Sequence, residues 1–339
     1  MSDNIVDEFA SELIVGLVSA VGTENSLVIN LLKERLDRAG YTTQVIKVSQ
    51  DVIPSLCDVP EHRNDHFNRI SSLMDAGNRA RGAGGDDVLA RGAAARISAQ
   101  RTKDDSGLTR PLSKVAFIID SLKRPEEVQE LRQIYPSGFV LIGIHADEAK
   151  RRTHLIHDLG ISNQNADELI RRDHEESKVE HGQRVTKTFY LADFFVRISE
   201  SLPRLRCDIQ RMVELWFGNP FITPTPDEHA MFLAFSASLR SADLSRQVGA
   251  VITRDSPILA TGANDCPKAG GGLYWPILKP DGCIGDIPLG RDHTRPDGDS
   301  NRAAQIRIIE QIVNDGYKEY GFNHDQLRAL LSKSVICDL

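Results

Sequence analysis

A candidate phosphate-binding loop lies near the N-terminus, between an apolar run and a helical pattern. It contains Gly16, Ser19, Gly22 and Thr23. In that position the backbone N–H groups of a glycine-containing loop, together with the N-terminus of the following helix, can hold phosphate oxygens. Five residues separate the two glycines, whereas the P-loop motif has four. The segment therefore matches a P-loop only in part.

The residues around this loop leave its chemistry open. A P-loop carries a lysine after its second glycine, but Thr23 stands there, and Glu24 follows where a hydroxyl group would reach magnesium. A carboxylate at that point repels phosphate. Asp120 ends an apolar run, which suits a magnesium-associated acid and equally an ordinary strand-end aspartate. Nucleotide binding without turnover and a structural remnant of a P-loop fold both stay open, whereas the missing lysine argues against phosphoryl transfer.

Strands and helices alternate over the first half of the chain. Apolar runs predict strands over 13–18, 42–48, 114–120 and 139–145, with a last strand or strand-turn over 188–198. Helical patterns cover 27–39, 126–135, 147–158 and 165–176. Residues 76–110, rich in Ala, Gly and Arg, interrupt this order, and we expect one helix over 87–100 within flexible flanks. The order predicts an α/β fold with a parallel sheet covered by helices on both faces.

A proline-rich connector over 218–226 separates two predicted domains, 1–217 and 227–339. Three of its nine residues are proline, which favours a stiff segment. A helix follows, with Thr225 as N-cap, Pro226 in its first position and Glu228 completing a capping box.

The second domain begins with a helix and a hairpin. Met231, Phe232, Phe235 and Leu239 give the helix an apolar stripe. Two strands are predicted around the turn residues R-D-S-P, and a long loop and two helices complete the chain. These predicted segments are the strands over 247–253 and 258–263, the loop over 264–300 and the helices over 302–317 and 324–333.

Residues 239–264 read L-R-S-A-D-L-S-R-Q-V-G-A-V-I-T-R-D-S-P-I-L-A-T-G-A-N. This stretch resembles the opening helix and hairpin of the deoxycytidylate deaminase family, with its pattern R-S-x-x-x-x-R-Q-V-G-A-V-I followed by A-T-G-x-N. The segments F-I-I-D-S-L-K-R-P-E-E-V, L-I-G-I-H and L-I-R-R-D look like a nucleotide-kinase-like domain. The combination resembles proteins implicated in bacterial defence against phage, in which such a domain precedes the deaminase domain. The implied fold is a P-loop kinase-like sheet followed by an incomplete cytidine-deaminase-like α/β/α domain.

The resemblance implies hydrolytic deamination of a deoxycytidine nucleotide, dCMP or dCTP. In the family a zinc-bound hydroxide attacks the cytosine ring and a glutamate moves protons. Asn264 would bind the sugar, while Arg246, Gln247 and Arg240 would reach a phosphate or frame the pocket. A turn role for Asn264 and a helix-cap role for Arg240 are the structural alternatives.

The zinc motif of that family, H-x-E followed by P-C-x-x-C, is missing from these 339 residues. His174 begins an H-x-E by letter, but no P-C-x-x-C follows it. Cys266 precedes its proline, and Cys337 has no second cysteine nearby. We therefore expect no catalytic residue and no zinc in this chain, as in a fragment or a truncated form that stops before the motif.

The loop over 264–300 carries Cys266, Cys283 and His293. By the same resemblance they would form part of a second, structural or regulatory metal site. Their spacing fits no standard zinc motif, so solvated loop residues are the alternative. The segment G-R-D-H at 290–293 offers a further phosphate contact.

Composition narrows the class of protein. The net charge of −7 argues against broad nucleic-acid binding. Five scattered cysteines without a C-x-x-C pair fit reduced thiols in the cytoplasm. We find no signal peptide and no apolar run of the about 18 residues that a membrane span needs. The resemblance adds deoxycytidine nucleotides as ligands, a homo-oligomer, and a regulatory RNA or protein inhibitor as a partner.

The leading interpretation is part of a zinc-dependent deoxycytidine nucleotide deaminase that depletes nucleotides in antiphage defence and is inactive in this form. A non-enzymatic nucleotide-binding or regulatory module is the alternative, and a nucleotide kinase is the third. Because a partial deaminase sheet leaves its faces uncovered, we also expect an exposed apolar face in the second domain.

Overall fold

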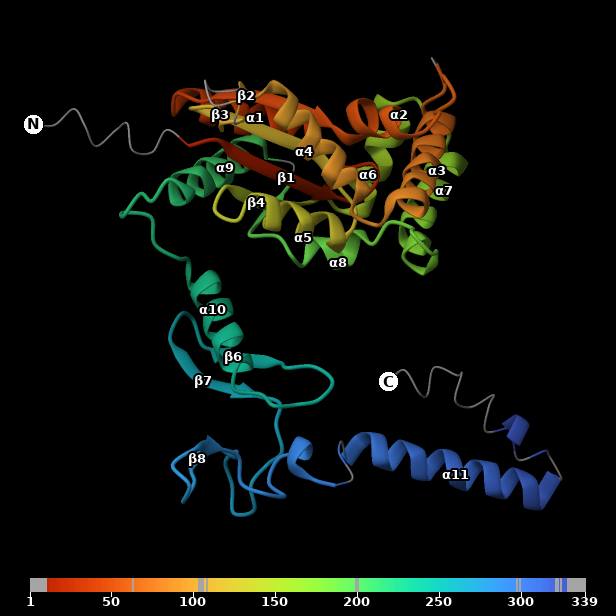
Figure 1. The fold of residues 1–339 in the computed structure, drawn as a ribbon, viewed down its shortest axis with the longest axis vertical. Coiled ribbons are helices and arrows are strands. Elements are labelled where there is room, and N and C mark those ends of the chain that lie inside the picture. Colours follow the sequence, from red (N-terminus) through yellow and green to blue (C-terminus); the bar gives the residue numbers. More distant parts are fainter. Residues whose placement is uncertain are drawn as a thin grey trace, which may run out of the picture. The chain divides into compact units, whose positions relative to one another are not determined.

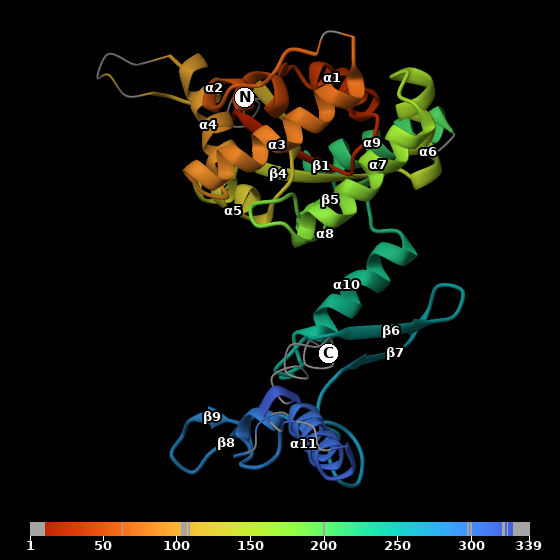
Figure 2. The ribbon, with the colours of Figure 1, turned by 90° about the vertical axis from the view of Figure 1, so that its right-hand side faces the viewer.

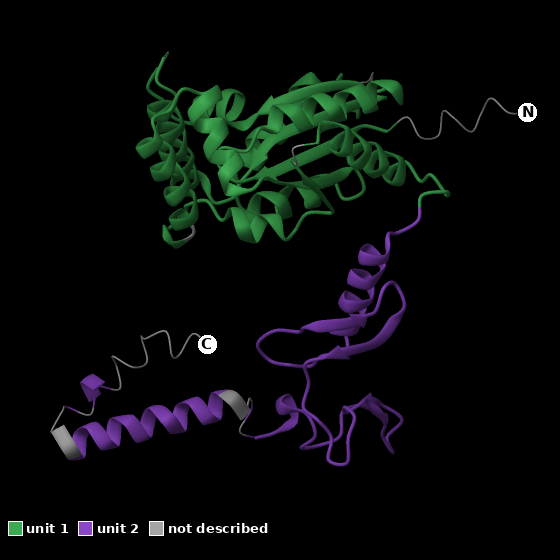
Figure 3. Cartoon of the chain, turned by 180° about the vertical axis from the view of Figure 1, so that it is seen from behind, with its two compact units in different colours: residues 1–222 green, residues 223–339 purple. Residues whose placement is uncertain are grey.

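The computed structural model describes residues 11–62, 64–102, 107, 109–198, 201–296, 298, 300–320, 323 and 325–327. Contacts divide the chain into two compact units (Figure 3). Unit 1 comprises residues 1–222 and unit 2 comprises residues 223–339, so the division falls within the proline-rich segment. In the described part, no helix is long and apolar enough to cross a membrane.

A parallel sheet forms the centre of unit 1 (Figure 1). In the described residues its five strands lie in the order β2-β3-β1-β4-β5. The strands are β1 (Leu13–Ser19), β2 (Thr42–Lys47), β3 (Val115–Leu122), β4 (Phe139–His145) and β5 (Phe194–Arg197). Every residue of β1 is buried, because β3 and β4 flank it and helices cover both faces. The first four predicted strands are confirmed to within two residues at each end.

Helices cover each face of this sheet. Val15 and Leu17 of β1 pack with α1 (Asn25–Arg38) and α9 (Leu202–Trp216) on one face. Ile14 and Val18, which point the other way, pack with α4 (Val88–Gln100) and α5 (Pro125–Ile134), and α8 (Val185–Phe189) borders the same core. The alternation of side chains along β1 thus supplies two separate cores, as a sheet buried on both faces requires.

The structure corrects two parts of the predicted order in unit 1. Residues 76–84, expected to be part of a flexible flank, form the second half of α3 (His66–Gly84), which begins with Asp65 as N-cap. The strand expected over 188–198 is instead the end of α8 followed by the short β5. The helix expected over 147–158 is confirmed in extent, as α6 (Glu148–Thr153) continued by a π-helical turn, η3 (His154–Asp158).

A further layer lies at the carboxyl end of β1. It consists of α3, η3 and α7 (Asn163–Glu175), and Figure 2 shows α3 and α7 close to each other. Met74, Leu155 and Leu169 form its small core, against which Val21 packs. The remaining short elements of unit 1 are η2 (Val48–Val52), α2 (Ile53–Leu56) and η4 (Glu176–Lys178).

Unit 2 contains a helix packed on a hairpin. Its elements are α10 (Pro226–Ser238), β6 (Gly249–Thr253), β7 (Ile258–Ala263), β8 (Ile277–Leu278), β9 (Ile284–Gly285), η5 (Asp292–Thr294) and α11 (Ser300–Tyr320). The predicted capping box is present, since the amide of Glu228 donates to Thr225 and the amide of Thr225 donates to Glu228. β6 and β7 pair antiparallel, as predicted. The helix expected over 324–333 lies mostly outside the described residues.

The apolar stripe of α10 is exposed. Met231, Phe232, Phe235 and Leu239 are between 64% and 71% exposed. α10 meets β6 so closely that a Cβ on Gly249 would clash with the carbonyl oxygen of Ala234. Only glycine permits this approach of helix to strand.

Replacing Gly249 with alanine should therefore separate α10 from the hairpin. We expect the variant to lose about 1–3 kcal/mol of stability in unit 2 and to exchange its amide hydrogens faster over 226–253. Hydrogen exchange followed by mass spectrometry measures this. Gly262→Ala on β7 is the matched control, because its added Cβ meets open space. Equal exchange in the two variants would contradict the packing described.

Candidate functional site

The loop after β1 is shorter than the sequence spacing predicted. Gly16 lies inside β1, paired with Ile119 and Leu141, and its missing side chain leaves room for the ring of Phe139, which a Cβ would approach to 2.8 Å. Gly16 is therefore a packing residue, which corrects its assignment to the loop. The loop itself covers residues 20–24, between Ser19 at the end of β1 and the first residue of α1.

Gly22 gives this loop its turn. Its φ of 80° lies in the left-handed region, where a side chain is strained. An added Cβ would also lie 2.9 Å from the carbonyl oxygen of Arg151. Thr23 and Glu24 follow, and Glu24 takes the N-cap position of α1 without a capping hydrogen bond from its side chain.

Three charged side chains from distant parts of unit 1 contact the loop or the end of β1 just before it. Lys123 Nζ donates to the carbonyl oxygen of Ser19 at 2.6 Å. Arg151 Nη1 donates to the carbonyl oxygen of Val21 at 3.0 Å. The amide N–H of Val21 donates to Asp173 Oδ2 at 3.1 Å. Two cations and one anion thus lie against a loop that has no lysine of its own.

Buried polar atoms without partners gather at this loop. The described part of the chain has eight such side-chain atoms, and four of them border the loop. They are Thr23 Oγ1, Asn25 Oδ1, Arg151 Nε and Asp173 Oδ1. Because buried polar groups in folded proteins are normally hydrogen-bonded, this concentration indicates that the loop suits a polar ligand.

Asp120 lies beside the first residue of α1. Its Oδ1 accepts a hydrogen bond of 2.6 Å from the side-chain amide of Asn25. Since β3 continues to Leu122, Asp120 lies within the strand and not at its end. The structure therefore brings together Ser19, Gly22, Thr23 and Asp120 of the predicted site, and leaves out Gly16.

A cavity of about 350 Å³ opens next to the loop, over the carboxyl ends of β2 and β3. Its volume lies within the range of small-molecule pockets. Charged and titratable side chains line it among apolar ones, namely those of His66, Arg69, Arg81, Asp120 and Lys123. The cations among them suit an anionic ligand.

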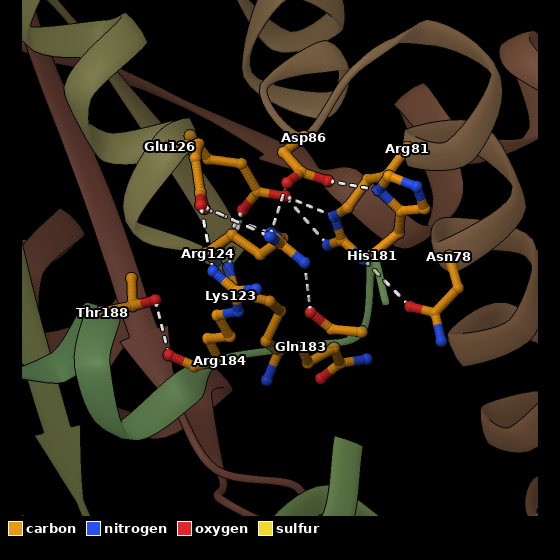
Figure 4. Close-up of polar contacts among 12 residues, drawn as sticks. Asn78, Arg81, Asp86, Lys123, Arg124, Glu126, His181, Gln183, Arg184 and Thr188 are labelled. Carbon is orange, nitrogen blue, oxygen red and sulfur yellow. Dashed lines mark hydrogen bonds and ion pairs between the residues drawn. The ribbon is translucent and has the colours of Figure 1, made fainter. Parts of the chain in front are cut away.

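A buried ion pair fixes the position of Lys123 (Figure 4). Arg81 and Glu127 are 2% and 1% exposed, and Glu127 Oε1 accepts from Arg81 Nε and Nη2 at 3.0 and 2.8 Å. Glu127 Oε2 accepts from the amides of Lys123 and Arg124 at 2.7 and 3.2 Å. One carboxylate thus joins α3 to the junction between β3 and α5.

The side chain of Lys123 is half-buried. Burial lowers the pKa of its ammonium group, and the nearby carboxylates of Asp173, Asp120 and Glu127 act in the opposite direction. A cation held in this way is poorly hydrated, so an incoming anion gains a strong interaction with it.

A second network surrounds the fully buried Arg124 (Figure 4). Its guanidinium donates to Asp86 at 2.6 Å, to the carbonyl oxygen of Gly182 at 2.7 Å, and to Glu126. Burial raises the pKa of Asp86. The hydrogen bond with His181 and the charges of Arg124, His181 and Arg184 lower it and together outweigh burial, so the pKa is below its ordinary value. Sequence reasoning missed this network and Lys123, although K-R-P-E-E directly after a buried strand was a usable signal.

The predicted substrate residues of unit 2 divide into two places. Asn264 donates to the carbonyl oxygen of Arg246 at 2.7 Å and accepts from the amide of Val248 at 2.6 Å, so its side chain braces the start of β6. The side chains of Arg246 and Gln247 lie at the surface there.

Arg240 lies elsewhere, with its guanidinium 3.8 Å from the ring centroid of Trp275. It borders a second cavity of about 450 Å³ over β7. The structure thus places Arg240 beside a cavity. Asn264 contacts Arg246 through the backbone carbonyl oxygen of Arg246.

The described residues of unit 2 do not assemble a site for a zinc ion. Among the residues that the structure describes, no group of three His, Cys, Asp or Glu side chains could hold a metal. His293 pairs with Asp286 at 3.0 Å, Cys283 is exposed, and Cys266 hydrogen-bonds with Asp292. The Cys266, Cys283 and His293 set is therefore not assembled, and Cys337 lies outside the described residues.

No protein-family model and no curated protein matches the chain. Solved structures that resemble it include a gluconokinase from Sinorhizobium meliloti 1021, 13% identical, with a TM-score of 0.34 over 62% of this chain and 98% of that one. A shikimate kinase from Acinetobacter baumannii in complex with shikimate is 9% identical, with a TM-score of 0.38 over 64% and 99%. Likenesses at this level carry no argument about what this chain binds.

Removing the Glu127 carboxylate should destabilise unit 1 strongly. Glu127→Ala leaves Arg81 buried without its partner, so we expect the free energy of unfolding to fall by about 3–5 kcal/mol. Urea unfolding followed by circular dichroism measures this loss. Glu130→Ala on the same helix should change it by no more than about 0.5 kcal/mol. Similar losses in both variants would show that the pair does not tie α3 to α5.

Proposed function

We propose that unit 1 binds a phosphorylated small molecule of the nucleotide class, with its phosphates at residues 20–24. The observation that carries this proposal is the gathering of partnerless buried polar atoms at one loop, among them Thr23 Oγ1 and Arg151 Nε. Hydroxyl and guanidinium donors at a helix N-terminus are groups that bind phosphate oxygens.

The charges beside the loop support the same proposal. Lys123 Nζ reaches the carbonyl oxygen of Ser19, and Arg151 reaches that of Val21. These two cations would supply part of the positive charge that a P-loop lysine provides, since Thr23 stands at the position of that lysine. The adjoining cavity, lined by Arg69 and Arg81, would take the remainder of the ligand.

Binding without phosphoryl transfer is the form of this activity that the residues favour. A transfer site aims a loop lysine at the phosphate that moves. Here Lys123 comes from the end of β3, and its ammonium is already bonded to the carbonyl oxygen of Ser19 at the end of β1. Such a cation can hold a phosphate group at the edge of the loop, and this is a binding role.

For unit 2 we propose the helix-and-hairpin part of a deaminase domain for deoxycytidine nucleotides. The close contact of Gly249 with α10 gives a physical reason for the glycine in R-Q-V-G-A, the segment on which the family resemblance rests. Because the described residues of unit 2 provide no metal site, the zinc donors of such a domain would have to come from elsewhere. Unit 2 would then contribute the wall formed by β7 and Arg240.

Calorimetry of the full chain with ATP, dCTP and dCMP tests the proposal for unit 1. We expect at least one triphosphate to bind, and Lys123→Met to weaken its binding by about 10-fold or more, because a charge-assisted hydrogen bond is lost. Lys33→Met is the control, since this exposed lysine lies on α1 away from the loop. No binding of any nucleotide at millimolar concentration would contradict the proposal, as would equal affinities of the two variants.

A further inference from the structure

We propose that the carboxylate of Asp173 occupies the position in loop 20–24 where a phosphate group of the ligand would bind. The two anions then compete, so that binding of the ligand releases α7. This inference rests on the proposed phosphate-binding function of unit 1. It adds a regulation of that site from within the chain.

The geometry at the loop carries the first step. Asp173 Oδ2 accepts the amide hydrogen of Val21 at 3.1 Å. A backbone N–H in a loop before a helix is the kind of donor that holds a phosphate oxygen. A carboxylate oxygen is also an anionic acceptor, and it comes here from a residue 152 positions away in the chain. Asp173 therefore acts as an internal substitute for phosphate.

The second step concerns how well Asp173 is accommodated. The residue is only 9% exposed, and its Oδ1 is buried without a hydrogen-bond partner. The charge of Lys123 stabilises the carboxylate from nearby. A buried charge with one unpaired oxygen is held weakly. A phosphate group has more oxygens, and it can also reach Thr23 Oγ1 and Arg151 Nε, so exchange of one anion for the other is favourable.

The third step links this position of Asp173 to the layer formed by α3, η3 and α7. Asp173 lies in the last turns of α7, next to Arg172, which donates to Ser71 and Asp75 of α3. Leu169 of α7 packs in the same small core as Met74 of α3. α3 lines the cavity beside the loop. An anion that displaces Asp173 therefore loosens the packing of α7 against α3.

Calorimetry with inorganic pyrophosphate on the full chain tests the competition. Asp173→Asn keeps the size of the side chain and an acceptor for Val21 while removing the charge. We expect it to bind pyrophosphate about 10-fold more tightly than the wild type, because the competing anion is gone. Asp167→Asn is the matched control, since Asp167 lies exposed on the same helix and pairs with Arg152. Its affinity should stay within about 2-fold of the wild type.

Hydrogen exchange on the wild-type chain gives a second readout that needs no variant. Bound pyrophosphate should raise exchange over 163–175, whereas a ligand that merely rigidifies the site would lower it. If the wild type binds and Asp173→Asn binds no more tightly, or if exchange of α7 falls, the competition is wrong and the binding function stands. If neither protein binds pyrophosphate or nucleotides, the binding function itself fails and the competition fails with it.

Discussion

The buried carboxylate of Glu127 is the interaction on which the geometry of unit 1 depends. Its two oxygens accept hydrogen bonds from the guanidinium of Arg81 and from the amides of Lys123 and Arg124. Removing such a charge from water is unfavourable unless each of its lone pairs is used. These donors come from α3 and from the end of β3. The carboxylate therefore fixes both the position of α3 beside the cavity and the backbone of Lys123.

The consequences extend to the loop after β1. Lys123 begins where Glu127 holds its backbone, and its side chain reaches the carbonyl oxygen at the end of β1. There it lies close enough to Asp173 for their charges to interact. Glu24, the N-cap of α1, is the one charged residue among 20–24. The cations beside the loop are therefore Lys123, from the end of β3, and Arg151, from α6. Asp173 of α7 adds a second anion.

Much of the fold follows from local patterns. The apolar runs predicted the first four strands because a sheet buried on both faces needs continuous apolar sequence. Thr225 and Glu228 predicted the start of α10 because a capping box is formed by neighbours in the chain. α3 was missed because small residues and arginines give a weak apolar period, although Met74, Ala76 and Ala80 of this helix are buried. α9 was missed although its buried residues, Leu205, Ile209 and Met212, follow a helical spacing.

The site was harder to predict than the fold. Gly22 and Thr23 could be chosen from the sequence because a glycine turn after a strand is recognisable locally, and Asp120 because it follows an apolar run. Lys123, Arg151 and Asp173 could not, since crossovers of the parallel sheet bring them to the loop from more than 100 residues away.

In unit 2 the sequence indicated the right element and left two roles open for Asn264, a sugar contact and a turn role. The structure shows the turn contacts, because the backbone at Arg246 and Val248 uses both polar atoms of its amide. A side chain that closes a hairpin and one that binds a ligand need the same donor and acceptor, so the residue type alone does not distinguish them.

The most direct test of the central claim is amide NMR of the isotope-labelled full chain during addition of inorganic pyrophosphate. If residues 20–24 bind phosphate, the amide signals of Val21, Gly22 and Glu24 shift in a saturable way, and signals in the β6–β7 hairpin stay in place. Unchanged signals throughout the loop at saturating pyrophosphate, or shifts confined to unit 2, would contradict the claim.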